Sequence, residues 1–394
     1  MKIENKNLIK KYNLPRNVVF CKKCTISNQR PRLKFDENGV CSACSYANHK
    51  KKNINWEKRE YELAELCDLH RGKNDKYDVI VPSSGGKDSA YVAHYLKEKY
   101  DMRVLTATWS PHLYTHIGFQ NFSDMINVGG MDNVLMTPNG QLHRKLTQAA
   151  FLEMGDPFQP FIFGQYSMPF RIALQYDVKL VVYGEDGEVE YGGEMKYADR
   201  SSLSHELFVK NRFSSVFPET FEKYGIKKKD LEKYGLSASE LKLLKEREIN
   251  QYFMSYYKKW IPQENYYYAV DNTGFKSNPE RNEGTFSKYA SIDDKLDGFH
   301  YYLMFIKFGI GRCTSDTAHE IRDGHLTRDE GIALVEKFDG EFPQKYYEVF
   351  LEYCDISEDD FIRVIDSWRS PHIWKKTNGE WRLRHTVGKK GVDD

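Results

Sequence analysis

The feature that most constrains this chain is a glycine loop between a short apolar run and a helical pattern. The run Tyr77-Asp-Val-Ile-Val-Pro82 precedes Ser83-Ser-Gly-Gly-Lys-Asp-Ser89, and the apolar residues of 90–97 recur at helical spacing. This order predicts a strand, a loop and a helix. Glycine lets a ligand approach the backbone closely, and the N–H groups of Gly86–Ser89 at a helix N-terminus can cradle phosphate oxygens. We therefore expect the loop to bind a pyrophosphate group.

The spacing separates this loop from other phosphate loops. It lacks the G-x-x-x-x-G-K-[S/T] and G-x-G-x-x-G patterns, whereas Ser84-Gly-Gly-Lys-Asp-Ser89 resembles the PP-loop of the ATP pyrophosphatase superfamily. The resemblance implies cleavage of ATP between the α and β phosphates, with AMP transferred to an oxygen that a nitrogen or sulfur nucleophile then displaces. A plain glycine turn is the alternative, which the context disfavours. The candidate nucleotide-binding residues are Ser83, Ser84, Gly85, Gly86, Lys87, Asp88, Ser89, Gly164 and Gly184.

Three further apolar runs are expected to be strands, at 103–109, 133–136 and 178–183, with helical segments between them. Strands that alternate with helices predict a doubly wound parallel α/β sheet with its ligand at the carboxyl edge. The last strand ends in Gly184-Glu-Asp186, which would lie beside the glycine loop. We expect Asp88, Glu185 and Asp186 to hold Mg²⁺ on the phosphates, and Lys87 to offset phosphate charge. Lys87, Asp88 and Glu185 are the catalytic candidates; for the two acids of the turn, a solvated turn is the alternative.

Four of the seven cysteines have zinc-ribbon spacing. Cys21-Lys-Lys-Cys24 and Cys41-Ser-Ala-Cys44 form two knuckles, and the turn-prone Asp36-Glu-Asn-Gly39 can bring the second back to the first. Four thiolates leave no open position, so the pattern predicts a structural zinc ion rather than a catalytic one. Disulfides or a redox pair are the alternatives. The remaining cysteines, Cys67, Cys313 and Cys354, are expected to be small buried residues.

The composition excludes several classes of protein. The chain has 394 residues, 58 Lys+Arg against 57 Asp+Glu, and 40% hydrophobic residues, which is typical of a folded protein of about two or three domains. A net charge of +1 provides no field for a polyanion, so a nucleic-acid partner is not expected. No apolar run is long enough to span a membrane and the N-terminus is too polar for a signal peptide, so we expect a cytoplasmic protein.

The second half reads as mostly helical. Residues 201–259 are highly charged, and Ser237-Ala-Ser-Glu240 is a capping box that opens a helix. A looser, aromatic, turn-rich stretch follows at Tyr266–Tyr289, and such stretches are frequently binding loops. Further helices are expected at 327–337, 345–352 and 357–368. We expect three domains: a zinc ribbon at 1–56, an ATP-binding domain at 57–200 and a helical insertion with a substrate or partner region at 201–394.

Several motifs taken together resemble the N-acetyl sugar amidotransferase family over nearly the whole chain. These are the cysteine ribbon, the PP-loop, Gly184-Glu-Asp186 with Glu190-Tyr-Gly-Gly193, and Lys307-Phe-Gly-Ile-Gly-Arg312 with Glu320-Ile-Arg322. The family serves lipopolysaccharide, O-antigen and flagellar sugar pathways, including those that make acetamidino forms of pseudaminic acid. The resemblance implies ATP and Mg²⁺ as cofactors and a structural Zn²⁺.

The resemblance also implies a reaction and its partners. The N-acetyl amide oxygen of a pseudaminic- or legionaminic-type sugar, or of a diacetamido nucleotide sugar, would be adenylated and then replaced by ammonia, with release of AMP and pyrophosphate. The cysteine census shows no glutaminase setting, so ammonia would come from a separate glutaminase subunit, with a cyclase-like subunit beside it. A tRNA thiolase, a lysidine-type synthetase and a non-catalytic zinc-ribbon protein are the alternatives.

The sugar is expected between the acidic turn at 185–193 and the second half of the chain. Arginine suits a carboxylate or phosphate, because its guanidinium can donate two parallel hydrogen bonds. For Arg312 and Arg322 the alternative is pairing with Asp316 and Glu320 across helical turns. The candidate sugar contacts are Glu190, Tyr191, Lys288, Arg312 and Arg322.

Overall fold

A parallel sheet lies at the centre of the computed structural model, which describes residues 5–203 and 216–389. Its five strands follow the order β3-β2-β1-β4-β5, and every neighbouring pair is parallel. This confirms the expected doubly wound α/β class and the four expected strands. The strands are β1 (Val79–Pro82), β2 (Val104–Trp109), β3 (Asp132–Met136), β4 (Leu180–Tyr183) and β5 (Asn250–Phe253).

The two faces of the sheet pack into two separate cores. Ile80 of β1 points to one face, where it packs with side chains of α6 and α7, while Val79 and Val81 point to the other face, toward α3 and α4. This alternation follows from the two-residue period of a strand, and burial on both faces explains the nearly continuous apolar runs. The helices of this part are α3 (Trp56–His70), α4 (Lys87–Tyr100), α5 (His116–Asn127), α6 (Gly140–Met154) and α7 (Gln159–Tyr176).

The winding of the chain reverses beside β1. The chain proceeds outward from β1 through β2 to β3, and then returns to form β4 on the opposite side of β1, with Val79 paired to Leu180. In open α/β sheets, ligands bind at the carboxyl edge where the strand order reverses. The segments that follow these two strands, Ser83–Gly86 and Gly184–Asp186, therefore lie at the expected ligand edge.

The fifth strand comes from the charged region that we expected to be helical. Gln251 and Phe253 of β5 are buried, and β5 pairs with β4 at the edge of the sheet. β5 is C-terminal to 57–200, so the sheet includes residues outside that range; the three-domain division stays a proposal. The capping box at Ser237 and Glu240 is present. The helical elements of this part are α8 (Gly187–Glu190), η1 (Met195–Tyr197), η2 (Pro218–Tyr224), α10 (Lys228–Leu231), η3 (Glu232–Tyr234), α11 (Ala238–Glu246) and α12 (Met254–Tyr257).

The aromatic stretch that we expected to be irregular begins as a regular helix. α13 (Pro262–Thr273) has Pro262 at its first position and Gly274 at φ +71° after its end, and it packs on α4. The irregular segment is thus confined to residues after Gly274. Further along, the expected helices are present, and Thr327 and Glu330 form a capping box. The helical elements are α14 (Asp297–Phe308), α15 (Arg312–Asp323), α16 (Arg328–Phe338), η4 (Gln344–Tyr346), α17 (Tyr347–Cys354) and α18 (Glu358–Ser367).

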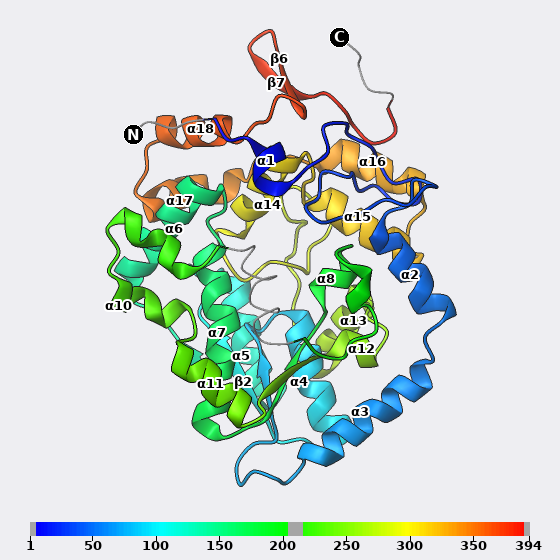
Figure 1. Cartoon of the computed structure of the whole chain (residues 1–394), viewed down its shortest axis with the longest axis vertical. Coiled ribbons are helices and arrows are strands. Elements are labelled where there is room, and N and C mark those ends of the chain that lie inside the picture. The colour runs from blue at the N-terminus through cyan, green and yellow to red at the C-terminus, as the bar shows by residue number, and fades with distance from the viewer. Residues whose placement is uncertain (1–4, 204–215, 390–394) are drawn as a thin grey trace.

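A third core joins the two ends of the chain. Side chains of α1 (Leu8–Tyr12) and of the cysteine knuckles pack with α14, α17 and α18. Thr25 Oγ1 lies 2.9 Å from Thr317 Oγ1, and His372 Nε2 lies 2.9 Å from Gln29 Oε1. α2 (Ser42–Lys52) and α3 connect this assembly to the sheet along one side of the molecule (Figure 1).

A two-stranded hairpin, β6 (Trp374–Thr377) and β7 (Glu380–Leu383), projects beyond the C-terminal helices (Figure 1). Sequence reasoning missed this hairpin. Among the described residues, no helix has both the length and the apolar character that crossing a membrane requires.

Candidate active site

The glycine loop forms a cradle between β1 and α4. The hydroxyl of Ser83 donates to Ser89 Oγ at 2.8 Å, the amide of Gly85 donates to Ser83 Oγ at 3.3 Å, and Ser89 Oγ donates to the carbonyl of Gly86 at 3.0 Å. Gly86 is the N-cap of α4 and has no side chain to cap the first turn. The N–H groups of that turn therefore point to the edge of the sheet, where they can bind an anion.

The two loop glycines have different structural roles. Gly85 has φ +88°, and a Cβ there would lie 2.5 Å from the Cα of Phe122 in α5, so the fold itself requires glycine. At Gly86 the nearest atom to such a Cβ is Ser84 Oγ, at 3.7 Å. Gly86 therefore leaves open space at the helix N-terminus, which is where phosphate oxygens would lie.

Lys87 and Asp88 begin α4 and are held by residues of the second half. The Lys87 ammonium is buried, forms an ion pair with Asp88, and lies 5.6 Å from the ring centre of Tyr289. Asn265 Nδ2 of α13 donates to Asp88 Oδ1 at 2.9 Å. The charged pair thus lies at the cradle, and its contact with phosphate and metal stays a prediction. Asn265 was not singled out in the sequence, because only the folding of α13 onto α4 brings it here.

The acidic turn after β4 faces the same space. Burial raises the pKa of Tyr191 far above its usual value, and the nearby carboxylates of Glu185 and Asp88 add to the shift. These three side chains therefore share one electrostatic environment. Asp186 is buried and caps α8, because its carboxylate accepts the N–H of Glu188 at 2.9 Å. The alternative of a solvated turn does not hold for Asp186.

Two candidate glycines are explained by packing alone. A Cβ on Gly164 would lie 2.0 Å from the ring of Trp109, and one on Gly184 would lie 2.9 Å from the ring of Trp260. Glycine is thus required at both positions to seat a tryptophan. Their role in nucleotide binding stays a prediction.

A Mg²⁺ ion at the acidic turn would need phosphate oxygens as well as protein carboxylates for its ligands. In the described part of the chain, the cysteine set is the only group of three or more His, Cys, Asp or Glu ligands close enough to share one ion. Mg²⁺ is commonly held by one or two carboxylates together with substrate phosphates and water. Asp88 and Glu185 fit that arrangement, and Asp186, already engaged as a cap, fits it less well.

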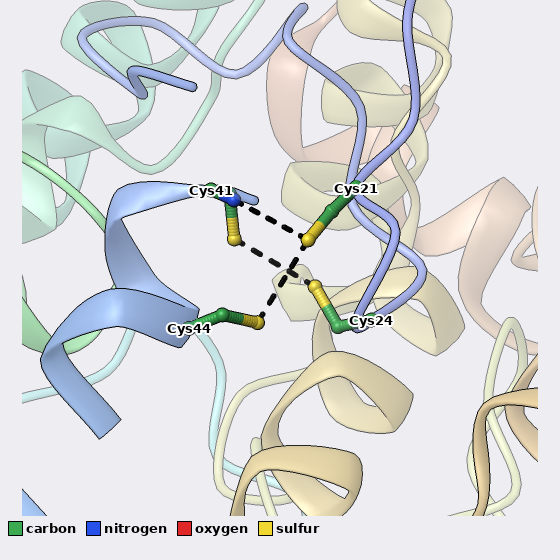
Figure 2. Close-up of side chains that lie close together, drawn as sticks. All are labelled: Cys21, Cys24, Cys41 and Cys44. Carbon is green, nitrogen blue, oxygen red and sulfur yellow. Dashed lines mark hydrogen bonds between the residues drawn. The ribbon is translucent and has the colours of Figure 1, made fainter. Parts of the chain in front are cut away.

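The four ribbon cysteines converge on one point (Figure 2). Cys21 Sγ lies 3.9 Å from Cys44 Sγ, and Cys24 Sγ lies 3.8 Å from Cys41 Sγ. Zinc–sulfur bonds of about 2.3 Å in a tetrahedron place sulfur atoms about 3.8 Å apart. The amides of Lys23 and Cys41 each donate to Cys21 Sγ at 3.3 Å, which is typical of a thiolate knuckle. The geometry fits a closed four-cysteine metal site.

The cysteine cluster is seated on the C-terminal helices. Arg328 of α16 donates from Nε to the carbonyl of Cys24 at 3.2 Å and from Nη2 to the carbonyl of Cys21 at 3.2 Å. The Arg322 guanidinium of α15 lies in the electrostatic field of Cys24 and Glu190. Arg322, which we expected to contact the sugar, therefore lies beside the cluster. There its positive charge offsets the negative charge of the thiolates.

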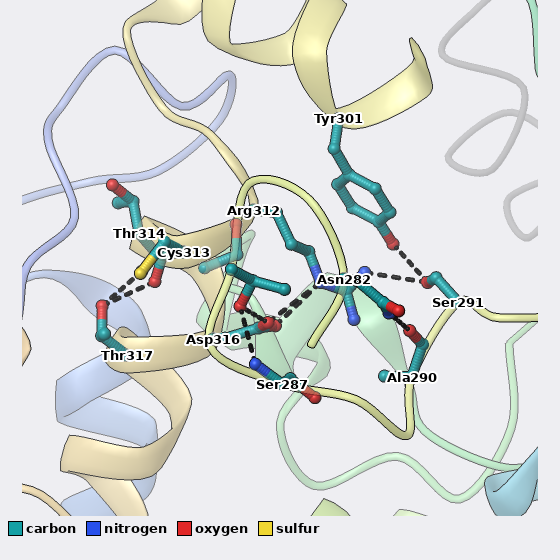
Figure 3. A network of polar contacts seen from close by, with 12 residues as sticks. Asn282, Ser287, Ala290, Ser291, Tyr301, Arg312, Cys313, Thr314, Asp316 and Thr317 are labelled. Carbon is teal, nitrogen blue, oxygen red and sulfur yellow. Dashed lines mark hydrogen bonds and ion pairs between the residues drawn. The ribbon is translucent and has the colours of Figure 1, made fainter. Parts of the chain in front are cut away.

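Of three other candidate sugar contacts, Glu190 and Arg312 have partners within the protein, and Lys288 lies on the surface. Glu190 is buried and forms an ion pair with Lys50 of α2, with Oε2 at 2.7 Å from Nζ. Arg312 pairs with Asp316 one turn along α15 at 3.0 Å, donates to Ser291 Oγ at 2.9 Å and stacks on Tyr301 (Figure 3). The alternative of helical pairing is thus present for Arg312. Lys288 is exposed.

An aspartate that the sequence analysis did not select, Asp293, contacts the glycine loop. Asp293 hydrogen-bonds Ser84, and its pKa is raised, first by burial and then by Asp294. Asp294 in turn accepts from the backbone N–H of His112 at 2.6 Å. The segment around Asp293 also approaches Gly118, where a Cβ would lie 2.4 Å from the Cα of Asp293. No motif marks this aspartate, because its role depends on the second half folding back over the loop.

A pocket of about 160 Å³ opens next to Tyr191. It lies between the acidic turn, the ribbon and the end of α14, and Tyr191 is the one expected sugar contact in its lining. The ribbon supplies two arginines that sequence reasoning did not select. The lining includes Arg30, Arg32, Glu188, Tyr191, Met304 and Phe308.

The fold and site thus define a doubly wound α/β protein with a pyrophosphate-type loop, a four-cysteine cluster and a helical C-terminal region. Residues 283–387 match the family model described as the C-terminal domain of WbpG-like LPS biosynthesis proteins. The chain therefore carries a C-terminal segment of WbpG-like type, which confirms for this segment the resemblance inferred from the motifs. The segment includes α14 to α18 and the hairpin up to Leu383.

Two solved structures are similar over half of the chain. An NH3-dependent NAD synthetase from Campylobacter jejuni subsp. jejuni NCTC 11168 is 17% identical, with 50% of this chain and 94% of that chain covered and a TM-score of 0.29. An NMN synthetase from Francisella tularensis is 13% identical, with the same coverages and a TM-score of 0.28. The comparison with curated proteins finds no match.

Proposed function

We propose that this chain is an ATP-dependent, AMP-forming amidotransferase that converts the N-acetyl group of a bacterial surface sugar into an acetamidino group. One observation carries the proposal: the glycine cradle and the acidic turn lie on adjacent strand ends, and Tyr191 joins them to a pocket beside the WbpG-like segment. An ATP site and a sugar site on either side of one side chain allow transfer between the two ligands.

The reaction divides into two balanced steps. The amide oxygen of the N-acetyl group attacks the α phosphorus of ATP, the α–β bond breaks, and pyrophosphate leaves. Ammonia then adds to the carbon of the O-adenylated imidate, the carbon–oxygen bond breaks, AMP leaves and the extra proton is lost. Adenylation is needed because an amide oxygen is a poor leaving group.

The residues at the cradle suit the first step. The N–H groups at the start of α4 and the buried Lys87 can hold the negative charge of the departing pyrophosphate. Asp88 and Glu185 would hold Mg²⁺, which offsets phosphate charge when it is bound. In the second step, positive charge develops on nitrogen, and the Glu185 carboxylate beside Tyr191 would stabilise it.

Ammonia is proposed to come from a separate glutaminase. Burial raises the pKa of Cys67 to about 12, and it raises the pKa of Cys313 and Cys354 as well. All three thiols are buried and thus protonated at neutral pH, whereas glutaminase chemistry of the cysteine type needs a reactive thiolate. A cyclase-like subunit beside the glutaminase belongs to the same proposal.

The test supplies the purified chain with ATP, Mg²⁺, an N-acetylated sugar acid or nucleotide sugar, and a nitrogen source. With ammonium we expect AMP, pyrophosphate and a sugar whose mass falls by the difference between O and NH. With glutamine alone we expect little amidine and no glutamate. ADP and inorganic phosphate as products would contradict the adenylation step, and robust glutamate release would contradict the separate glutaminase.

A further inference from the structure

The pocket beside Tyr191 has one positive charge more than its own residues neutralise. Arg32 forms an ion pair with Glu188, with Nη2 at 2.9 Å from Oε2. Arg30 also lines the pocket, and its guanidinium lies 5.2 Å from the ring centre of Tyr191. Among the described residues, no carboxylate forms a hydrogen bond or an ion pair with the Arg30 side chain. Two guanidinium groups thus face one carboxylate.

The placement of Arg30 is unfavourable for a cation without a ligand. Arg30 is half-buried, and burial lowers its pKa. The neighbouring charges of Arg322 and Arg32 lower this pKa further, whereas Tyr191 and Glu188 oppose the shift. A charge removed from water is stabilised by a partner of opposite sign or by several hydrogen bonds. The face of Tyr191 provides only part of this stabilisation. An anion in the pocket would provide the rest.

The backbone of Arg32 is the second, independent observation. Arg32 has φ +68°, in the left-handed region that glycine and asparagine adopt most readily. Its side chain is half exposed, whereas the Glu188 carboxylate with which it pairs is buried. Strained backbone conformations of this kind concentrate at binding sites. The strain is explained if Arg32 must present its guanidinium to the pocket.

We propose that Arg30 and Arg32 bind the anionic group of the sugar substrate, and that the ribbon is therefore part of the substrate site. The shared chemistry is a carboxylate or a phosphate, which a guanidinium binds through two parallel hydrogen bonds. The occupant, an N-acetylated sugar, rests on the proposed function. With the anion at the arginines, the rest of the sugar can extend past Tyr191 toward Glu185 and the cradle.

The test measures binding by titration calorimetry in the absence of ATP, so it is independent of turnover. The probes are N-acetylneuraminic acid, which carries a carboxylate, UDP-N-acetylglucosamine, which carries a diphosphate, and neutral N-acetylglucosamine. We expect one anionic probe to bind at least about tenfold more tightly than the neutral sugar, because a charge-assisted contact is worth that factor or more. Preference for the first probe identifies a sugar acid, and preference for the second identifies a nucleotide sugar.

Three variants assign that preference to the arginines. Arg30→Gln should weaken binding of the anionic probe by about tenfold or more, whereas Arg16→Gln, an exposed change on the same N-terminal segment, should leave it unchanged. Arg32→Gly should also weaken binding of the anionic probe. Glycine relieves the positive φ but leaves the buried Glu188 carboxylate without its ion pair, so the unfolding temperature of this variant combines two opposing effects. Unchanged binding of the neutral sugar by both variants distinguishes a contact with the anion from a structural role.

The inference is overturned if neither anionic probe binds more tightly than the neutral sugar, or if Arg30→Gln and Arg32→Gly bind the preferred probe as the unsubstituted chain does. If amidine forms while these substitutions leave binding unaltered, the anion site fails and the proposed function stands. If arginine-dependent binding is found but no amidine forms with any sugar, the proposed function fails and the anion site stands.

Discussion

Lys50 Nζ lies between the two carboxylate oxygens of Glu190, at 2.9 and 2.7 Å, and both side chains are buried. Lys50 belongs to α2, the helix that begins in the second cysteine knuckle and contains Cys44, and Glu190 closes the acidic turn. Burial raises the pKa of Glu190, and Lys50 opposes that shift. The pair therefore fixes the ribbon to the turn that carries Glu185 and Tyr191.

Removing one member of this pair should destabilise the protein strongly. Lys50→Met leaves a buried carboxylate without its partner, and we expect a loss of about 3 kcal/mol in the free energy of unfolding, measured with urea. Lys50→Met combined with Glu190→Gln should cost less than the sum of the single changes. The control is Lys58→Met, which removes an exposed pair with Glu62 and should cost under about 0.5 kcal/mol. Additive single effects would contradict the coupling.

The cysteine cluster should contain one tightly bound zinc ion per chain. Cys41→Ser removes a ligand, so we expect loss of zinc by elemental analysis and a large drop in unfolding temperature, because metal binding and folding of the ribbon are linked. The control is Cys67→Ser, a buried thiol in another core, which should retain its zinc. Zinc content and stability that survive Cys41→Ser would rule out a structural zinc site.

The two loop glycines provide a matched pair of substitutions. Gly85→Ala should lower the unfolding temperature, because its Cβ would meet the Phe122 backbone and alanine disfavours a positive φ. Gly86→Val should leave that temperature nearly unchanged and abolish ATP binding, because its side chain would occupy the open space of the cradle. Both effects can be followed by thermal unfolding with and without ATP and Mg²⁺. Normal ATP binding by Gly86→Val would place the phosphates elsewhere.

A buried carboxyl at the start of α14 should make stability depend on pH. Burial raises the pKa of Asp297 to about 7, and Asp293 and Asp294 add to the shift, while His300 and Arg312 oppose it. The unfolded chain ionises this group near pH 4, so it binds fewer protons than the folded chain between pH 4 and 7. Stability from this group therefore falls as pH rises through that window.

Asp297→Asn removes that dependence. Relative to the unsubstituted chain, we expect the variant to gain about 1–3 kcal/mol in the free energy of unfolding between pH 4.5 and 8, since the limiting slope is about 1.4 kcal/mol per pH unit. Urea titrations at several pH values measure the difference. Parallel stability curves would mean that Asp297 titrates alike in the folded and unfolded chains.

The part of the fold that local patterns determine was predictable from the sequence. The four strands at 79–183 and the two capping boxes have signals within a few neighbouring residues, such as apolar runs or Ser237 with Glu240. β5 was missed, because an edge strand of four residues in a charged segment has little periodicity. α13 was misread because its tyrosines resembled a loop, although Pro262 and Gly274 mark its two ends.

The candidate site was predictable only where one segment carries the chemistry. The PP-loop and the cysteine pairs are such segments. Asn265, Asp293 and Arg30 reach the site through packing of distant elements, and no local spacing marks them. Conversely, Glu190 and Arg312 were expected to contact the sugar because of their charge, yet in the folded chain each forms an ion pair with another residue of the protein.

The seat of the ribbon on the C-terminal helices has a consequence for biosynthesis. Gln29 and His372 are in contact although 343 positions separate them, so the ribbon leaves the ribosome long before its seat does. At about 5–20 residues per second, that interval is roughly 20–70 s. Closing so long a loop is also slow, because its entropy is lost before distant contacts form. During this time the knuckles can gather a metal ion, whereas the arginine-lined pocket acquires its wall only after α14 (Asp297–Phe308) has been made, so the metal site can form before the pocket does.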